Sequence, residues 1–169
     1  GFPTHVKFGM QVDTVIANGV ECDPLLQCDQ RLMESRAAEM VRGVLLAMEA
    51  TGAKRGILAL KEEYQAAQAA LRRAISSVSS RAELSLLLME SRYPAGDEFV
   101  LVYEATGRLV PETRLPLHVG CLVQNVQTLF NMARATRGAA VTHRLLTVAG
   151  AVARPVTLWA PVGTVLGDV

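Results

Sequence analysis

The stretch Asn18-Gly19-Val20-Glu21-Cys22-Asp23-Pro24 follows directly after residues 12–17, a mostly apolar run that predicts a buried strand. A strand that ends in a loop with an amide, a glycine and two carboxylates is typical of the ligand-binding edge of an α/β sheet. This stretch therefore predicts both the fold class and a polar site at the carboxyl end of the first strand.

Apolar spacing after this loop alternates between helical and strand periods. The predicted elements, in chain order, are a helix over 30–50, a strand over 56–60, a helix over 62–76 and a strand over 84–89. Asp29 is a candidate N-cap of the first helix, and Gly52 is its natural end. We expect the methionines of that helix to be core, and the last strand to be buried on both faces. The pattern predicts a Rossmann-like parallel sheet flanked by helices.

The last part of the chain has shorter apolar segments and more turn residues than the part before it. Helices are predicted over 96–105 and 126–136, with a proline-punctuated loop over 111–118 between them. After residue 137 the sequence alternates weakly over 144–148 and is apolar again over 156–159, with turn residues around both segments. We therefore divide the chain into an α/β domain over 1–137 and the beginning of a small β-rich module over 138–169.

Composition narrows the function classes. The chain has 169 residues and a net charge of +1 from 17 basic and 16 acidic residues, with no basic field, which argues against nucleic acid as a partner. No apolar run is long enough to span a bilayer, and the start does not resemble a signal peptide, so we expect a cytoplasmic location. The chain opens inside a motif, which indicates a fragment of a longer protein. Its three cysteines are expected to be reduced thiols, and its scattered histidines suggest no metal site.

Three further motifs are polar or contain glycine, and each adjoins a predicted strand or helix end. They are Gly1-Phe2-Pro3-Thr4-His5-Val6-Lys7, Tyr93-Pro94-Ala95-Gly96-Asp97-Glu98 and Gln124-Asn125-Val126-Gln127-Thr128. In this order, the motifs resemble the flavin- and NADH-binding family. Its members include the flavoprotein subunit of respiratory complex I, the C subunit of the Rnf electron-transport complex and the cobalamin reductase of propanediol-utilising microcompartments. The sequences of residues 12–19 and 24–26 look most like the cobalamin reductase. Residues 147–155 resemble the beginning of the family's β-grasp domain.

The resemblance implies that FMN and NADH are the cofactors and that electrons pass from NADH through FMN to a further acceptor. It implies cob(III/II)alamin reduction in a bacterial microcompartment, with cobalamin or a cobalamin-dependent enzyme system and microcompartment proteins as partners. No Cys-x-x-Cys-x-x-Cys run is present, so iron–sulfur clusters are expected only in parts of the full-length protein beyond this chain. Two alternatives stay open: an Rnf-type C subunit, and a non-catalytic docking fragment.

The phosphate side of the flavin is expected at Gln124, Asn125 and Thr128, because amide and hydroxyl groups at a helix start suit a phosphate. The alternative for Asn125 is a simple N-cap. The resemblance implies that Lys7 contacts phosphate or ribityl oxygens, and a surface lysine is the alternative. Phe2 offers a stacking face for the nicotinamide or flavin ring.

The ring side is expected at the first loop and at residues 93–98. The resemblance implies flavin contacts from Asn18 and Glu21, with Val20 standing where complex I relatives carry an aspartate. Asp23 faces the dinucleotide ribose or belongs to a turn. The remaining wall is predicted to be Gly96, Asp97 and Glu98. The resemblance places Glu98 near the nicotinamide as the catalytic candidate, and compensation of a helix dipole is its alternative role.

Overall fold

A parallel sheet forms the centre of the computed structural model, which describes residues 4–78, 82–165 and 167. Its strands are β1 (Thr14–Gly19), β2 (Arg55–Lys61), β3 (Glu83–Met89) and β4 (Cys121–Asn125), in the spatial order β3-β2-β1-β4. Every pairing within this sheet is parallel, which confirms the predicted α/β class. Because β2 lies on one side of β1 and β4 on the other, the topological switch point falls between β1 and β4.

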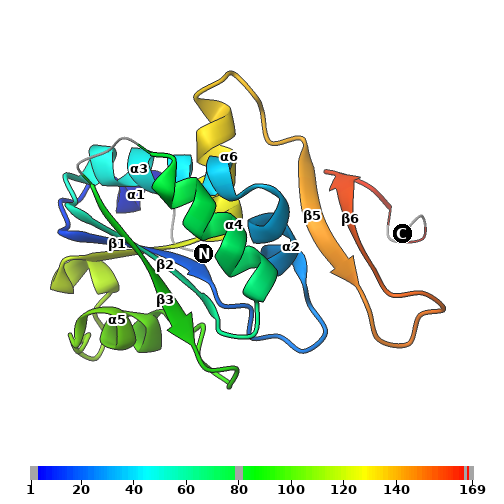
Figure 1. Cartoon of the computed structure of the whole chain (residues 1–169), viewed down its shortest axis with the longest axis horizontal. Helices are drawn as coiled ribbons and strands as arrows, with labels where there is room; N and C mark the ends of the chain where they lie inside the picture. The colour runs from blue at the N-terminus through cyan, green and yellow to red at the C-terminus, as the bar shows by residue number, and fades with distance from the viewer. Residues whose placement is uncertain (1–3, 79–81, 166, 168–169) are drawn as a thin grey trace.

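Helices cover both faces of the sheet (Figure 1). One face carries α2 (Cys28–Ser35), α3 (Ala37–Thr51), α4 (Gln65–Ser76) and α6 (Val126–Ala135), and the other carries α5 (Glu98–Thr106). The short helix η1 (Pro116–Val119) leads into β4, and α1 (Thr4–Lys7) begins the described part of the chain. The arrangement is the helix–sheet–helix layering that the alternating pattern predicts.

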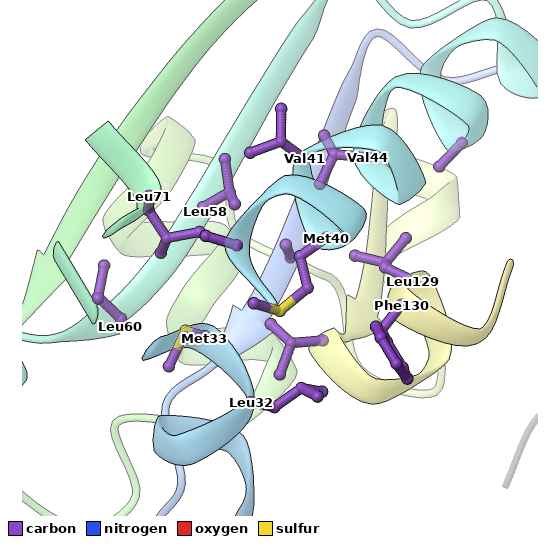
Figure 2. Packing of buried hydrophobic residues seen from close by; sticks show 14 of the residues in the cluster. Leu32, Met33, Met40, Val41, Val44, Leu58, Leu60, Leu71, Leu129 and Phe130 are labelled. Carbon is purple, nitrogen blue, oxygen red and sulfur yellow. The ribbon is translucent and has the colours of Figure 1, made fainter. Parts of the chain in front are cut away.

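Strand periodicity explains why the sheet has an apolar cluster on each face. Val15 and Ala17 pack toward the larger helical layer, whereas Ile16 between them packs toward α5. Figure 2 shows Met33 and Met40 inside the larger cluster. Both side chains are fully buried, so the methionines of this region are core, as predicted.

The long helix predicted over 30–50 is two helices in the structure. Arg36, with φ of −133° and ψ of 30°, separates α2 from α3. Asp29 is not an N-cap: it lies in the first turn of α2, and Gln27 occupies the cap position. The residues on both sides of Arg36 favour a helix, and their apolar spacing continues across it. The sequence pattern therefore does not reveal the break between α2 and α3. The predicted end at Gly52 is confirmed by its left-handed backbone, with φ of 74°.

Two strand predictions need correction. Residues 84–89 are not buried on both faces, because β3 is an edge strand and Leu88 is 41% exposed. The strand β4 was not predicted at all. Only four of its residues, 121–124, are buried, and a left-handed glycine precedes them, so its apolar run is too short to stand out.

The predicted late strands form an antiparallel hairpin of β5 (His143–Val148) and β6 (Val156–Pro161). This hairpin packs against the helical layer rather than standing free (Figure 1). Leu145 joins the larger core cluster, and the rings of Phe130 and Trp159 lie 5.7 Å apart. The boundary at 137/138 and the assignment of the hairpin to a β-grasp module stay predictions.

Candidate functional site

The motifs around Asn18 and Asn125 meet at the switch point. Asn18 near the end of β1 pairs in register with Asn125 at the end of β4 and with Ala59 of β2. In open α/β sheets, ligands bind outside the carboxyl ends of the strands at this position. We call the group of side chains around Asn18 and Asn125, at the carboxyl ends of β1, β2 and β4, the rim.

Gly96 joins the loop after β1 to the loop over 93–97. The side-chain amide of Asn18 donates to the Gly96 carbonyl at 2.9 Å, and the Gly96 N–H donates to the Cys22 sulfur at 2.9 Å. The Asn18 oxygen also accepts from the backbone N–H of Val20 at 3.0 Å. A Cβ at position 96 would collide with the Val20 carbonyl and would lie 2.9 Å from the Cys22 sulfur. Only glycine permits this close approach of the two loops.

A cation and a carboxylate lie on the α5 side of the rim. Lys7 at the end of α1 donates to the Val123 carbonyl at 3.1 Å, and its ammonium lies 3.8 Å from the Glu98 carboxylate. These side chains are 17% and 35% exposed, respectively, so neither is a freely solvated surface group. Asp97 is the N-cap of α5 and accepts from the backbone N–H groups of Phe99 and Val100. The structure thus brings Lys7 to β4 and next to Glu98, and the cofactor contacts expected of both residues stay predictions.

A buried carboxylate organises the α2 side. Asp29 accepts from the Asn125 side-chain amide at 2.7 Å and from the Gln127 amide at 2.9 Å. The Asn125 oxygen simultaneously caps α6 by accepting from the Gln127 backbone N–H at 2.8 Å. Asn125 is therefore an N-cap, the alternative given for it, and its amide group also holds the rim to α2; its expected contact with the flavin phosphate stays a prediction.

Glu21 lies beside this cluster and has an unusual acidity. Its carboxylate accepts from the Asp29 backbone N–H at 3.4 Å. Burial, followed by repulsion from the Asp29 carboxylate, raises the pKa of Glu21 to about 7. Burial also raises the pKa of Asp29, against the opposing effect of the two amide donors. Glu21 is therefore poised between its two protonation states near neutral pH.

A buried acceptor at the rim has no donor among the described residues. Gln124 is 9% exposed, and its Oε1 atom makes no hydrogen bond. By strand alternation it faces the same side as Leu122, which packs into the larger cluster. An unpaired buried acceptor costs about 1–3 kcal/mol. A ligand with O–H or N–H donors, such as the ribityl hydroxyls and ring N–H of a flavin, would satisfy it, so the residues present fit that group.

For three other predicted site residues, the structure describes no side-chain contact that bears on the prediction. Asp23 is exposed and forms no hydrogen bond or ion pair with any residue that the structure describes. Thr128 is half-buried in the first turn of α6, and within the described chain its side chain makes no hydrogen bond. Phe2 lies outside the described residues. The cofactor contacts of these three residues stay predictions.

Three rim residues were missed as site residues at the sequence level. Lys61 ends β2 and its positive charge lowers the pKa of Glu21, Gln127 binds Asp29, and Cys22 accepts from Gly96. Lys61 directly follows a predicted strand, so the rule that ligands gather at strand ends would have selected it. The roles of Gln127 and Cys22 depend on contacts across the sheet and have no local signal.

Two kinds of feature are absent from the described part of the chain. None of the helices described has both the length and the apolar character that crossing a bilayer requires. Within the same residues, no three His, Cys, Asp or Glu side chains are placed to hold a metal ion.

Comparisons with known proteins find similar sequences over most or all of the chain. Residues 1–134 match the protein family described as the Nuo51 FMN-binding domain. The whole chain is 49% identical to the cobalamin reductase PduS of Citrobacter freundii and 47% identical to that of Salmonella typhimurium. Over 96% of its length it is 36% identical to the C subunit of the Na⁺-translocating ferredoxin:NAD⁺ oxidoreductase complex of Acetobacterium woodii. The chain spans 37% of the length of each of these relatives.

Solved structures show the same fold. Crystal structures of an NAD⁺-reducing NiFe hydrogenase, in the H₂-reduced and the air-oxidised state, superpose on 99% of the chain with a TM-score of 0.81. Sequence identity to both is 28%, and the match covers 35% and 34% of the hydrogenase chains. The parallel sheet and the hairpin that follows it are thus found together in a known redox protein.

Proposed function

The chain belongs to the Nuo51 FMN-binding domain family, and we propose that its rim binds FMN and takes electrons from NADH, as one part of a longer electron-transfer protein. The observation that carries this proposal is the junction at Gly96. It fixes two loops against each other at the switch point, which is where open α/β sheets bind their ligands.

The proposed phosphate position is the start of α6. There the positive end of the helix, the Thr128 hydroxyl and the Lys7 ammonium favour an anion. Lys7 is already held at the end of β4 by the Val123 carbonyl, so little side-chain freedom would be lost on binding. Gln124 supplies the unpaired acceptor for a ribityl or ring donor.

The ring position is proposed beside the junction that Gly96 forms with the loop after β1. Asn18 has both its amide oxygen and its amide nitrogen bonded to backbone, so we assign it to positioning Gly96 as well as to the flavin edge. Val20 is buried, and its carbonyl packs against Gly96, so the backbone here takes the place of the aspartate of complex I relatives. Asp97 acts by fixing the start of α5.

The dinucleotide is proposed to lie over the same edge. When bound, FMN supplies the hydride-accepting and electron-releasing chemistry. The chain's residues orient the reactants: Phe2 by stacking, Asp23 at a ribose, and Glu98 near the nicotinamide with its charge offset by Lys7. Glu21, with its pKa near neutrality, is able to hold a proton beside the ring.

For the final acceptor we favour cob(III/II)alamin, because relatives named cobalamin reductase match the whole chain at 49% and 47% identity. A bacterial microcompartment, with its proteins as partners, is proposed on the same ground. The second candidate is an Rnf-type C subunit, which the 36% identity to the Acetobacterium woodii protein favours. Iron–sulfur clusters, if used, belong to other parts of the full-length protein.

An anaerobic titration of the full-length protein with FMN and then NADH tests the proposal. We expect saturable FMN binding, bleaching of the flavin absorbance by NADH, and recovery of that absorbance when cob(III)alamin is added. Lys7→Met should weaken FMN binding at least tenfold. Lys54→Met is the matched control, because Lys54 is exposed and precedes β2 at the opposite edge of the sheet. A folded protein that binds no FMN would refute the proposal in favour of a docking fragment. Oxidation of the reduced flavin by NAD⁺ but not by cobalamin would favour the Rnf-type alternative.

A further inference from the structure

A second candidate site lies where α3, α6 and the hairpin meet. It is a groove of about 420 Å³ that residues from four separate parts of the sequence line. Its basic and aromatic lining is Arg36, Phe130, Arg134, Arg137, His143 and Trp159. We call it the arginine groove, and its volume falls within the range of small-molecule sites.

Two aromatic rings give the arginine groove an apolar wall. Phe130 of α6 is buried, and Trp159 of β6 is 40% exposed, with the ring planes tilted by 37°. Because tryptophan side chains are highly buried on average, the exposed part of Trp159 stands out, and a second ring could stack on it. The guanidinium of Arg134 lies 5.5 Å from the centre of the Phe130 ring, which fixes this arginine beside the aromatic wall.

Positive charge in the arginine groove exceeds negative charge. Glu39 is the single carboxylate in its lining and already pairs with Arg36 at 3.5 Å. Arg137 is exposed, and neither it nor Arg134 forms an ion pair with any carboxylate in the described part of the chain. Guanidinium groups bind phosphate oxygens in pairs and stack on flat rings, so this combination suits an anion attached to a ring.

Ordinary surface chemistry explains only part of this cluster. Arg134 lies in the last turn of α6 and Arg137 follows the helix, and cations at this end offset the helix dipole. That explanation does not extend to Arg36, which lies between α2 and α3, or to the exposure of Trp159 on the hairpin. Their convergence on one groove needs a separate reason.

The arginine groove is distinct from the rim. Asn125 begins α6 at the rim, whereas Arg134 lies at the other end of this ten-residue helix. At about 1.5 Å per residue, the two ends are roughly 15 Å apart. A ligand in the arginine groove therefore does not compete with FMN for the same residues.

We propose that the arginine groove binds a nucleoside monophosphate, with the base stacked on Trp159 and the phosphate held by Arg36, Arg134 and Arg137. The inference is independent of the proposed flavin chemistry, because it uses none of the rim residues. Binding there would be weakened by salt, since exposed charges supply much of the attraction.

Fluorescence of flavin-free protein tests this proposal, because Trp159 is the only tryptophan in the chain. Titration with AMP should quench the emission to saturation, and Arg137→Ala should weaken binding at least fivefold. Arg73→Ala is the matched control, because Arg73 is exposed in the last turn of α4 and is distant in sequence from the arginine groove. Calorimetry on Trp159→Phe, which keeps a stacking ring, should still detect AMP without the optical signal. Melting curves show whether each variant is folded.

Four outcomes would overturn the proposal. Equal affinity for adenosine would show that the ring alone binds, and equal affinity for inorganic phosphate would show that the charge alone binds. Binding of a poly-glutamate peptide with no binding of AMP would identify a surface for acidic proteins. Absence of saturable binding in a folded protein would mean that the arginines are only a solvated face.

Discussion

Replacing Gly96 with alanine tests the junction on which the rim depends. The added Cβ would approach the Val20 carbonyl oxygen more closely than 3.0 Å and the carbonyl carbon at 3.2 Å, and these are backbone atoms that cannot rotate away. The loop over 93–97 must therefore move. That movement stretches two hydrogen bonds of 2.9 Å, from Asn18 to the Gly96 carbonyl and from the Gly96 N–H to Cys22.

The magnitude follows from these contacts. Overpacking of this kind costs about 1–3 kcal/mol, and each strained hydrogen bond adds up to about 1 kcal/mol. Allowing for partial relaxation, we expect Gly96→Ala to lower the free energy of unfolding by about 2–4 kcal/mol. Displacement of the proposed ring platform should also raise the Kd for FMN at least tenfold, which corresponds to about 1.4 kcal/mol.

Urea denaturation of flavin-free protein measures the first effect, and FMN fluorescence titration measures the second. Gly9→Ala is the control, because the nearest atom to a Cβ there is at an ordinary distance of 3.5 Å. The reasoning is refuted if Gly96→Ala unfolds at the same urea concentration as the unaltered protein. Lost stability with unchanged FMN affinity would mean that the junction holds the fold but does not carry the cofactor.

Three further predictions concern two rim residues and the packing of α3 against α6. Because burial raises the pKa of Glu21 from about 4.5 to about 7, the folded state binds more protons than the unfolded state, so stability should fall as pH rises through this window. Glu21→Gln should flatten the stability–pH curve from urea denaturation, leaving the slope that comes from the raised pKa of Asp29. Asn125→Ala removes the cap of α6 and a donor to Asp29, and should cost about 1–3 kcal/mol by the same assay, while an unchanged midpoint would contradict the assigned contacts. Gly43→Ala would push a Cβ into the backbone of Leu129 where α3 crosses α6, and calorimetry should show a melting temperature lower by several degrees, whereas an unchanged value would mean that the helices separate freely.

Sequence patterns were sufficient for the architecture and for the region of the site. The apolar run over 12–17 and the helix end at Gly52 are local features, and the structure keeps both, with the first strand shifted to Thr14–Gly19 so that it includes Asn18 and Gly19 of the predicted loop. Strand order was not available from such patterns, because nothing in the sequence of β4 says that it lies beside β1. The pairing of Asn18 with Asn125, on which the switch point depends, therefore came only from the structure.

Side-chain roles at the site were harder to predict than their location. Asp29 has the sequence signature of an N-cap, yet its carboxylate binds amides that lie 96 and 98 residues further along the chain. Edge position decided the exposure of β3, whose apolar residues predict full burial. In each case a long-range contact outweighed a local preference.

The short helix α2 has a consequence for electron transfer. Its first residues touch both regions of the molecule: Asp29 orders the rim, while Cys28 lies 3.1 Å from the Thr147 hydroxyl of the hairpin. A domain attached after β6 would thus be held in position relative to the strand ends where a flavin is proposed to bind. Two adjacent residues of α2, Cys28 and Asp29, make this connection. The rate of electron tunnelling falls steeply with the distance between donor and acceptor. The contacts of α2 would keep the distance between the flavin and an acceptor in such a domain constant while the rest of a longer protein moves.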